Sequence, residues 1–281
     1  MKYTTFYFSG TGNTRWAVSE FTNIIQEKGH QAEMFAIDIG TQLTDVQIRT
    51  IVNEADSIGF ANPIYGGDLP PIMRTFLNRM VGLIGPLATV KNAYVINTYG
   101  YVNAFGPKEM QKLLAGSGLT LTAYVNIQLC NNVTSSKPLD RTKLAKRMER
   151  GRHELNHLAD SLIAGRKRIK GHGPQLLIGA MIRQKVPEAI AKFYQTLGVD
   201  RTTCTRCMVC VKNCPTGSIR MKGDKFVFSA GCTACMRCYN FCPTGAITID
   251  GVVADPQKFP RYQGPEASAL RDPATRQDDV S

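Results

Sequence analysis

A repeated cysteine spacing near the C-terminal end constrains this chain more than any other feature. The pattern CxxCxxCxxxCP occurs twice, and it contains eight of the nine cysteines. Those eight are Cys204, Cys207, Cys210, Cys214, Cys232, Cys235, Cys238 and Cys242. The second copy follows the first at an offset of 28 residues, and the Cys-Pro-Thr-Gly that closes the first copy returns in the second. Two copies of this spacing are typical of two 4Fe-4S clusters, which carry electrons one at a time.

Two other uses of eight cysteines fit the pattern less well. Zinc also takes four thiolates, but zinc modules usually pair one CxxC with a distant CxxC or histidine. A CxxCxxC triplet followed by CP is not a usual zinc spacing. A disulfide framework requires an oxidising compartment. Because nothing at the N-terminus resembles a secretory signal, we expect a cytoplasmic protein with reduced thiols.

On these two repeats, residues 201–250 resemble a bacterial two-cluster 4Fe-4S ferredoxin, within a domain that we place at 200–253. The resemblance implies crossed ligation, in which each cluster takes three thiolates from one repeat and the last cysteine of the other. One cluster would be bound by Cys204, Cys207, Cys210 and Cys242, and the other by Cys232, Cys235, Cys238 and Cys214. Soluble ferredoxins of this type are usually acidic, whereas this stretch is basic. Its cations are Arg201, Arg206, Lys212, Arg220, Lys222, Lys225 and Arg237.

A second site is predicted at the N-terminus. An apolar strand at 3–8 runs into a loop, and a helical stretch follows from Arg15 to about Lys28. The loop residues are Ser9, Gly10, Thr11, Gly12, Asn13 and Thr14. Glycines let the backbone approach a ligand, and the first N–H groups of a helix attract an anion. The loop has neither the third glycine of GxGxxG nor the GK[ST] of a Walker loop, so a different kind of phosphate site is predicted.

Four further apolar runs predict buried parallel strands, each separated from the next by a segment of helix length. They cover residues 32–37, 57–61, 93–97 and 119–129. This alternation predicts a doubly wound parallel sheet. Ligands of such sheets lie at the carboxyl ends of the strands, where the strand order reverses. The loops after the third and fourth strands should therefore face the phosphate loop.

Residues 1–165 resemble the flavodoxins, whose TGNT-type loop grips the monophosphate of FMN. The resemblance implies that the loops after strands three and four hold the isoalloxazine ring. The predicted FMN-binding residues are Ser9, Gly10, Thr11, Gly12, Asn13, Thr14, Pro63, Ile64, Tyr65, Gly66, Thr98, Tyr99, Gly100 and Tyr101. The three tyrosines are candidates for stacking on the ring, with amphipathic surface residues as the alternative. Cys130 is predicted to be a small buried residue rather than a redox thiol.

The whole chain resembles the fused flavodoxin/ferredoxin proteins of anaerobes. This resemblance implies an α/β flavodoxin-like doubly wound parallel sheet, followed by a C-terminal α+β domain like that of bacterial ferredoxins. Between them we predict a helical connector at 166–199, which packs the clusters against the flavin domain rather than lying on a membrane surface. Its apolar stretch at 176–182 is too short to span a bilayer. Pro187 should start a helix with Ile190, Phe193 and Leu197 on one face, and the polar residues 254–281 should form a mobile tail.

Two features of the sequence suggest other functions, a zinc protease and a nucleic-acid-binding protein. Residues 153–157 match the zinc-protease motif HExxH, but they lie on a basic helix that begins near Asp140, so we interpret the match as chance. The formal net charge of +12 suggests nucleic acid. However, FMN and two clusters each contribute about −2, which leaves about +6, and no nucleic-acid-binding module is visible. The remaining charge favours an acidic partner such as a ferredoxin or flavodoxin.

These features predict an iron–sulfur flavoprotein oxidoreductase that passes electrons between two clusters and FMN. Because no NAD(P) fingerprint is present, the electron source should be a protein. The favoured interpretation is a ferredoxin-dependent flavin reductase of a small acceptor. The alternative is an electron-transfer relay between redox proteins, with no substrate of its own. The sequence indicates no catalytic residue, and it leaves open whether the clusters face the flavin of the same chain or of a neighbour in a homodimer.

Overall fold

The structure is a computed structural model that describes residues 1–41, 43–87, 89–101, 103–131, 140–171, 186, 188–253, 255 and 261–265. Its N-terminal part is a six-stranded parallel sheet in the order β2-β1-β3-β4-β5-β6. The strands are β1 (Lys2–Tyr7), β2 (Gln31–Ala36), β3 (Ser57–Pro63), β4 (Lys91–Tyr99), β5 (Leu119–Gln128) and β6 (Arg168–Ile169). The first five strands follow the 2-1-3-4-5 order of the flavodoxin-like fold. The predicted doubly wound sheet is confirmed.

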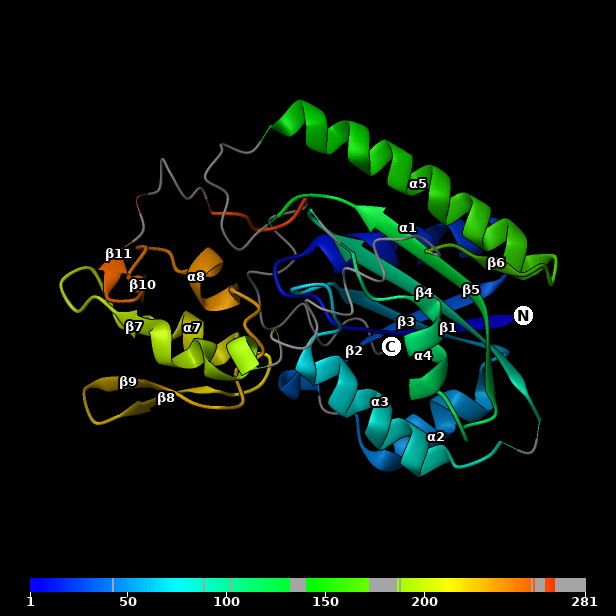
Figure 1. Ribbon diagram of the computed structural model, residues 1–281, viewed down its shortest axis with the longest axis horizontal. Coiled ribbons are helices and arrows are strands. Elements are labelled where there is room, and N and C mark those ends of the chain that lie inside the picture. The colour runs from blue at the N-terminus through cyan, green and yellow to red at the C-terminus, as the bar shows by residue number, and fades with distance from the viewer. Residues whose placement is uncertain are drawn as a thin grey trace.

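Helices cover both faces of this sheet, as Figure 1 shows. One face carries α1 (Asn13–Glu27) and α5 (Arg141–Ile163), and the other carries α2 (Asp45–Glu54), α3 (Pro71–Ile84) and α4 (Pro107–Leu113). A short 3-10 turn, η1 (Ile39–Thr41), follows β2. Each face has its own apolar core, centred on Trp16 and Leu155 in one case and on Phe60 and Phe76 in the other. Both faces of the sheet are therefore closed to water, and its strand ends are left to form a site.

The helix starts follow from local sequence. Thr44 and Gln47 form a capping box at the start of α2, with each side chain bonded to the other residue's backbone N–H. Asp140 caps α5 by accepting a hydrogen bond from the Lys143 N–H at 2.9 Å, which confirms the predicted start of that helix. Such caps satisfy N–H groups that the first turn of a helix leaves without partners.

The HExxH match lies on the outer side of α5. His153 and His157 are exposed. The Glu154 carboxylate pairs with Arg168 at 3.0 Å and with Lys170 at 2.8 Å. Partial burial alone raises the pKa of Glu154, but these two cations lower it overall. Glu154 therefore holds β6 against α5, and the interpretation of the motif as a chance match agrees with this structural role.

The predicted connector at 166–199 contains two strands that the sequence analysis missed. β6 adds Arg168 and Ile169 to the sheet beside β5. The helix expected through Leu197 ends earlier, because residues 188–192 are helical, η2 (Phe193–Thr196) is a 3-10 turn, and β7 (Leu197–Val199) is a strand. Gly198 disfavours a helix, and pairing of β7 with a strand of the C-terminal domain takes its place. Residues 172–185 and Pro187, including the apolar stretch at 176–182, lie outside the described residues.

The C-terminal domain lies beyond the carboxyl ends of the parallel strands (Figure 1). Its elements are α7 (Val209–Lys212), β8 (Ile219–Lys222), β9 (Lys225–Phe228), α8 (Arg237–Phe241), β10 (Ile247–Ile249) and β11 (Val252–Val253). Strands β11, β10 and β7 form one antiparallel sheet, and β8 and β9 form a hairpin. Met236, Tyr239 and Ile247 form its small apolar core. Nothing in the described part of the chain is a helix with the length and apolar character needed to cross a membrane.

Candidate cofactor site between the two domains

The loop between β1 and α1 is shaped to receive an anion. All six loop residues from Ser9 to Thr14 are buried. Gly12 has φ 108°, a left-handed conformation that glycine adopts without strain, and it starts α1. The Ser9 hydroxyl accepts hydrogen bonds from the N–H groups of Gly12 at 3.1 Å and Arg15 at 3.2 Å. The loop therefore gathers N–H groups at a helix N-terminus, where a phosphate is favoured.

The loops after β3 and β4 meet this loop. The Thr14 and Thr98 hydroxyls share a buried hydrogen bond of 2.8 Å. Below them, the Asn62 amide donates to Asn97 at 2.6 Å and the Asn97 amide donates to Asn126 at 3.0 Å. These hydrogen bonds cross three adjacent strands at their carboxyl ends. They fix the three loops relative to one another.

A cavity of about 500 Å³ lies among these loops, within the range of ordinary small-molecule sites. Every predicted FMN-binding residue except Gly12 lines it, together with Gly67, Cys130 and Asn131. Among the described residues, the rest of its lining comes from Val186, Ala189, Ile190 and Phe193 of the connector and from Ala234 of the second cysteine repeat. One cavity therefore touches the phosphate loop, both predicted ring loops and the loop of the second cysteine repeat. Val102 and Asn132, at the ends of two of these loops, are not described.

The three candidate tyrosines differ in their surroundings. Tyr65 is 8% exposed and packs edge-on against Phe8, Tyr99 is half-buried, and Tyr101 is 65% exposed. Tyr65 precedes a tight turn in which Gly66 and Gly67 have φ 56° and 84°, which is the backbone of a two-residue hairpin turn. The Tyr65 hydroxyl is buried and has no hydrogen-bond partner among the described residues. Burial raises the pKa of Cys130, which lies at the edge of the cavity and is disfavoured as a thiolate.

A larger cavity of about 670 Å³ lies on the other side of the connector, between α3 and the loops around Pro215 and Cys232. Its charged residues Asp68 and Arg74 pair with each other, Asp38 pairs with Arg237, and Arg79 pairs with Asp45. The phosphate loop does not line it. The smaller cavity, which the phosphate loop does line, is therefore the candidate cofactor site.

Both cysteine repeats share an unusual backbone. Arg206 and Met208 have φ 55° and 62°, and the residues 28 positions later, Ala234 and Met236, have φ 52° and 59°. Left-handed conformations are costly for residues with a side chain, and they persist where the surrounding structure or a ligand compensates. Each pair flanks the second cysteine of its repeat. The two loops therefore coil in the same way around their thiols.

Hydrogen bonds to the last thiol of each repeat also match. The Ser218 N–H points to the Cys214 sulfur at 3.3 Å, and the Ala246 N–H points to the Cys242 sulfur at 3.3 Å. Thr216 and Thr244 place their hydroxyls 3.7 and 3.8 Å from the same two sulfurs. This geometry explains why Cys-Pro-Thr-Gly recurs in the sequence: its turn aims donors at the sulfur.

The thiols gather into two groups. Burial raises the pKa of Cys210 to about 11, and the neighbouring thiols Cys242, Cys204 and Cys207 add to the rise. Burial also raises the pKa of Cys235 to about 12, with Cys214 and Cys232 as its neighbouring thiols. Crossed ligation, with Cys242 beside the first repeat and Cys214 beside the second, stays a prediction.

The distances between the thiols concern the alternative that the cysteines bind zinc. Among the described residues, no three His, Cys, Asp or Glu side chains converge closely enough to hold one metal ion. A zinc ion draws four thiolates to about 2.3 Å from one centre, whereas the thiolates of a 4Fe-4S cluster each bind a different iron and stay further apart. The cysteine spacing CxxCxxCxxxCP remains the observation that favours clusters over zinc.

Arg237, one of the cations that make the stretch 201–250 basic, joins the two domains. It is 3% exposed and pairs with Asp38 at 2.6 Å. It also donates hydrogen bonds to the backbone carbonyls of Ser9, Gly10 and Asn213. Because Arg237 lies between Cys235 and Cys238, this contact fixes the second cysteine repeat against the phosphate loop. No local pattern indicates it, since Asp38 is 199 residues away.

A C-terminal segment, residues 261–265, also joins the two domains, although it falls in the predicted tail. Arg261 donates hydrogen bonds to the carbonyls of Tyr239 and Cys242 at 2.9 Å. Tyr262 is 5% exposed, and its hydroxyl donates to the Asn13 side chain. Asn13 in turn donates to the Cys130 carbonyl at 3.1 Å, so its side chain holds loops together. The remainder of the predicted tail is not described, apart from Asp255.

These features fit the cofactors that the sequence predicts. Gly10 leaves room for close contact, because a Cβ there would lie 2.2 Å from the Tyr65 hydroxyl and 2.9 Å from the Cys235 carbonyl. A Cβ on Gly100 would lie 2.9 Å from Asn131. The buried Tyr65 hydroxyl without a partner and the strained loops around the thiols are both expected where a bound group completes the site.

Comparison with known proteins agrees with the C-terminal assignment. Residues 203–247 match the family described as 4Fe-4S dicluster domain. The chain joins a flavodoxin-like domain to a ferredoxin-type 4Fe-4S domain. The strand order, the phosphate loop and this match indicate an iron–sulfur flavoprotein that takes part in electron transfer. No curated protein sequence matches the chain.

Several solved structures resemble the N-terminal part. A flavodoxin from Archaea has 16% identity and a TM-score of 0.40, over 57% of this chain and 98% of its own. A putative quinone reductase from Klebsiella pneumoniae has 15% identity and a TM-score of 0.45, over 63% of this chain and 93% of its own. The rubredoxin oxygen:oxidoreductase from Desulfovibrio gigas has 16% identity and a TM-score of 0.42, over 58% of this chain and 36% of its own. At these identities and scores, the similarities say nothing about function.

Proposed function

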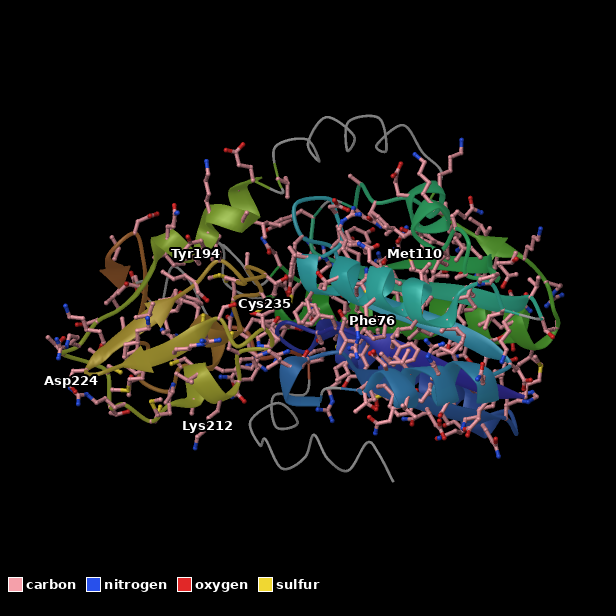
Figure 2. The ribbon with its side chains drawn as sticks, turned by 90° about the horizontal axis from the view of Figure 1, so that it is seen from below. Phe76, Met110, Tyr194, Lys212, Asp224 and Cys235 are labelled. Carbon is pink, nitrogen blue, oxygen red and sulfur yellow. The ribbon has the colours of Figure 1, made fainter. Side chains whose placement is uncertain are left out.

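We propose that this protein binds one FMN and two 4Fe-4S clusters and passes electrons between them within one chain. The observation that carries the proposal is the position of the second cysteine repeat. Ala234, between Cys232 and Cys235, is part of the wall of the flavin cavity, and Cys235 lies against Gly10 of the phosphate loop. Figure 2 shows Cys235 at the junction of the two domains. A second chain is therefore not needed to bring a cluster to the flavin.

Residue roles follow from this arrangement. Ser9, Thr11 and the N-terminal N–H groups of α1 would hold the phosphate. Tyr99, Gly100 and the turn after Tyr65 would hold the ring. The eight repeat cysteines would hold the clusters as two crossed sets. When bound, the clusters supply one-electron transfer and FMN couples it to two-electron chemistry.

The electron balance requires two partners, an electron donor and an electron acceptor. Two molecules of a reduced one-electron iron–sulfur protein each supply one electron, and a small oxidised acceptor takes up both electrons with two protons from solvent. The two sets of thiols match this supply, because each cluster passes a single electron. A relay with two clusters would fit this supply as well. We favour a ferredoxin-dependent flavin reductase, because residues of the connector add a wall to the cavity beside the predicted ring loops, whereas a relay needs an exposed flavin edge.

The cofactor content tests the first part of this proposal. We expect about one FMN and about eight irons per chain after anaerobic reconstitution, because each 4Fe-4S cluster holds four irons. Replacing Cys235 by serine should reduce the iron content by about half. Iron and flavin analysis of the purified variants would show it. Full iron with no flavin in the unaltered protein would contradict the FMN assignment.

A partner should dock at the outer cluster, which is the one that Cys204, Cys207, Cys210 and Cys242 would hold. Cys207 is exposed, and the surface beside Cys204 carries Arg201 and Lys225. Lys222 lies opposite Lys225 in the β8-β9 hairpin. Such a cationic surface attracts an acidic protein and speeds its encounter. We therefore propose an acidic ferredoxin or flavodoxin as the electron donor at this surface.

Charge reversal tests the docking surface. The triple variant Arg201→Glu, Lys222→Glu and Lys225→Glu should reduce the second-order rate of reduction by an acidic ferredoxin at least about tenfold at low ionic strength. Because salt screens exposed charges, the difference should shrink towards about 1 M salt. Stopped-flow absorbance measures both rates.

A matched variant separates local docking from net charge. Lys108→Glu, Lys146→Glu and Arg150→Glu make the same total change on exposed positions of α4 and α5. This control should reduce the rate much less than the first variant. Equal losses in the two triple variants would contradict a docking surface at the outer cluster.

Kinetics with small acceptors separate the enzyme from the relay. An enzyme that holds its acceptor beside the flavin should be reoxidised with saturable kinetics by at least one small acceptor. A relay without a substrate site should show rates that rise linearly with the concentration of each acceptor. Single-turnover reoxidation of the photoreduced protein, followed at the flavin band over a range of acceptor concentrations, distinguishes the two.

A further inference from the structure

Tyr65 links the flavin cavity to the inner cysteine set, Cys232, Cys235, Cys238 and Cys214. The residue lines the cavity, and its ring packs against Phe8. Its hydroxyl, however, is buried beside Gly10 and has no hydrogen-bond partner among the described residues. A buried phenol without a partner costs free energy, so such a group is expected to meet an acceptor when the site is complete.

The Tyr65 hydroxyl lies close to Cys235 of the inner set. A Cβ added to Gly10 would lie 2.2 Å from the Tyr65 hydroxyl oxygen and 3.2 Å from the Cys235 Cβ. The distance between the Tyr65 hydroxyl and the Cys235 Cβ therefore cannot exceed the sum of these two distances. The Cys235 thiolate is one bond further on. The absence of a side chain at Gly10 is what allows this approach.

We propose that the Tyr65 hydroxyl donates a hydrogen bond to a sulfur of the cluster bound by the inner cysteine set, and that this bond raises the reduction potential of that cluster. The inference rests on the proposed function, since it assumes that the inner set holds a cluster. Hydrogen bonds to the sulfurs stabilise the more negative, reduced state. Tyr65 is thus a positioning and tuning residue rather than only a candidate for ring stacking.

Arg237 adds to the difference between the two sets. It lies between Cys235 and Cys238 in the sequence, and its buried guanidinium donates to the Ser9 and Gly10 carbonyls and pairs with Asp38, which balances its charge. The outer set lacks such an environment, because Cys207 is exposed and Arg206, its neighbour, pairs with the exposed Asp224 at 3.0 Å. An electron that arrives at the outer cluster would therefore move to an inner cluster that is easier to reduce, next to the flavin.

Tyr65→Phe is the direct test, because it removes only the hydroxyl oxygen, which has no hydrogen-bond partner among the described residues, and keeps the ring. In a potentiometric titration followed by EPR, one of the two cluster potentials should shift downwards by about 59 mV, which is a tenfold change in a one-electron equilibrium. The other cluster potential and the FMN content should stay the same.

Tyr99→Phe is the control, since Tyr99 lines the same cavity from the β4 loop and is not among the neighbours of Gly10. It should leave both cluster potentials unchanged. Two results would overturn the inference: unchanged potentials in Tyr65→Phe, or a weaker affinity for FMN with unchanged potentials, which would place the hydroxyl on the flavin instead. Failure of the proposed function would appear earlier and separately, as missing iron or missing FMN in the unaltered protein.

Discussion

Arg237→Met is expected to lower the free energy of unfolding by about 3–5 kcal/mol, because it leaves the Asp38 carboxylate buried without its cation. The same change removes the hydrogen bonds that hold the Ser9 and Gly10 carbonyls. We therefore also expect the affinity for FMN to fall by at least about tenfold, or about 1.4 kcal/mol. Chemical denaturation and fluorescence titration with FMN measure the two effects.

Arg206→Met is the matched control within the other repeat. Arg206 pairs with Asp224, but both side chains are more than half exposed. Exposed pairs contribute about 0–1 kcal/mol, so this variant should stay close to the unaltered protein and retain FMN. A double variant, Arg237→Met with Asp38→Leu, should recover part of the stability without recovering the affinity for FMN. If Arg237→Met unfolded at the same denaturant concentration as the unaltered protein, the buried pair would not be joining the domains.

Gly10→Ala should have the second large effect. The new Cβ would lie 2.2 Å from the Tyr65 hydroxyl and 2.9 Å from the Cys235 backbone oxygen. A side chain can turn away, but the Cys235 backbone is held by its neighbouring loop, so the two domains must separate slightly. Overpacking of this kind costs about 1–3 kcal/mol. We expect loss of FMN and a decrease in iron content, measured by cofactor analysis after anaerobic purification.

Gly82→Ala provides the comparison for this change. Gly82 lies in α3, and a Cβ there meets no atom within 4 Å. Alanine in a helix interior should stabilise the protein by about 0.5–1 kcal/mol. Adding Tyr65→Phe to Gly10→Ala should relieve the clash with the hydroxyl but not the one with Cys235. Complete recovery of the cofactors in that double variant would show that the contact with the Cys235 backbone is not limiting.

The sequence was sufficient for the elements whose patterns are local. Apolar runs of strand length predicted β1 to β5, and Asp140 marked the start of α5, because such signals depend on neighbouring residues. The repeat of Cys-Pro-Thr-Gly pointed to matched loops, and the structure shows the same backbone and the same donors to sulfur in both copies.

The contacts between the domains could not be predicted in this way. Arg237 reads as one more surface cation until the fold brings Asp38 and the Ser9 carbonyl to it. Tyr262 lies in a polar, proline-bearing stretch and meets Asn13 from the opposite end of the chain. Strand β6 has two residues in a basic segment, too few for any periodicity. Each depends on pairings between residues far apart in the sequence.

An anaerobic reductive titration of the protein, followed by visible absorbance, tests the central claim most directly. The account predicts uptake of about four electrons per chain, two by FMN and one by each cluster. In Arg237→Met, which is expected to lose FMN, uptake should fall to about two electrons while the cluster bands still bleach. Uptake of about two electrons by the unaltered protein, with no flavin band, would contradict the account.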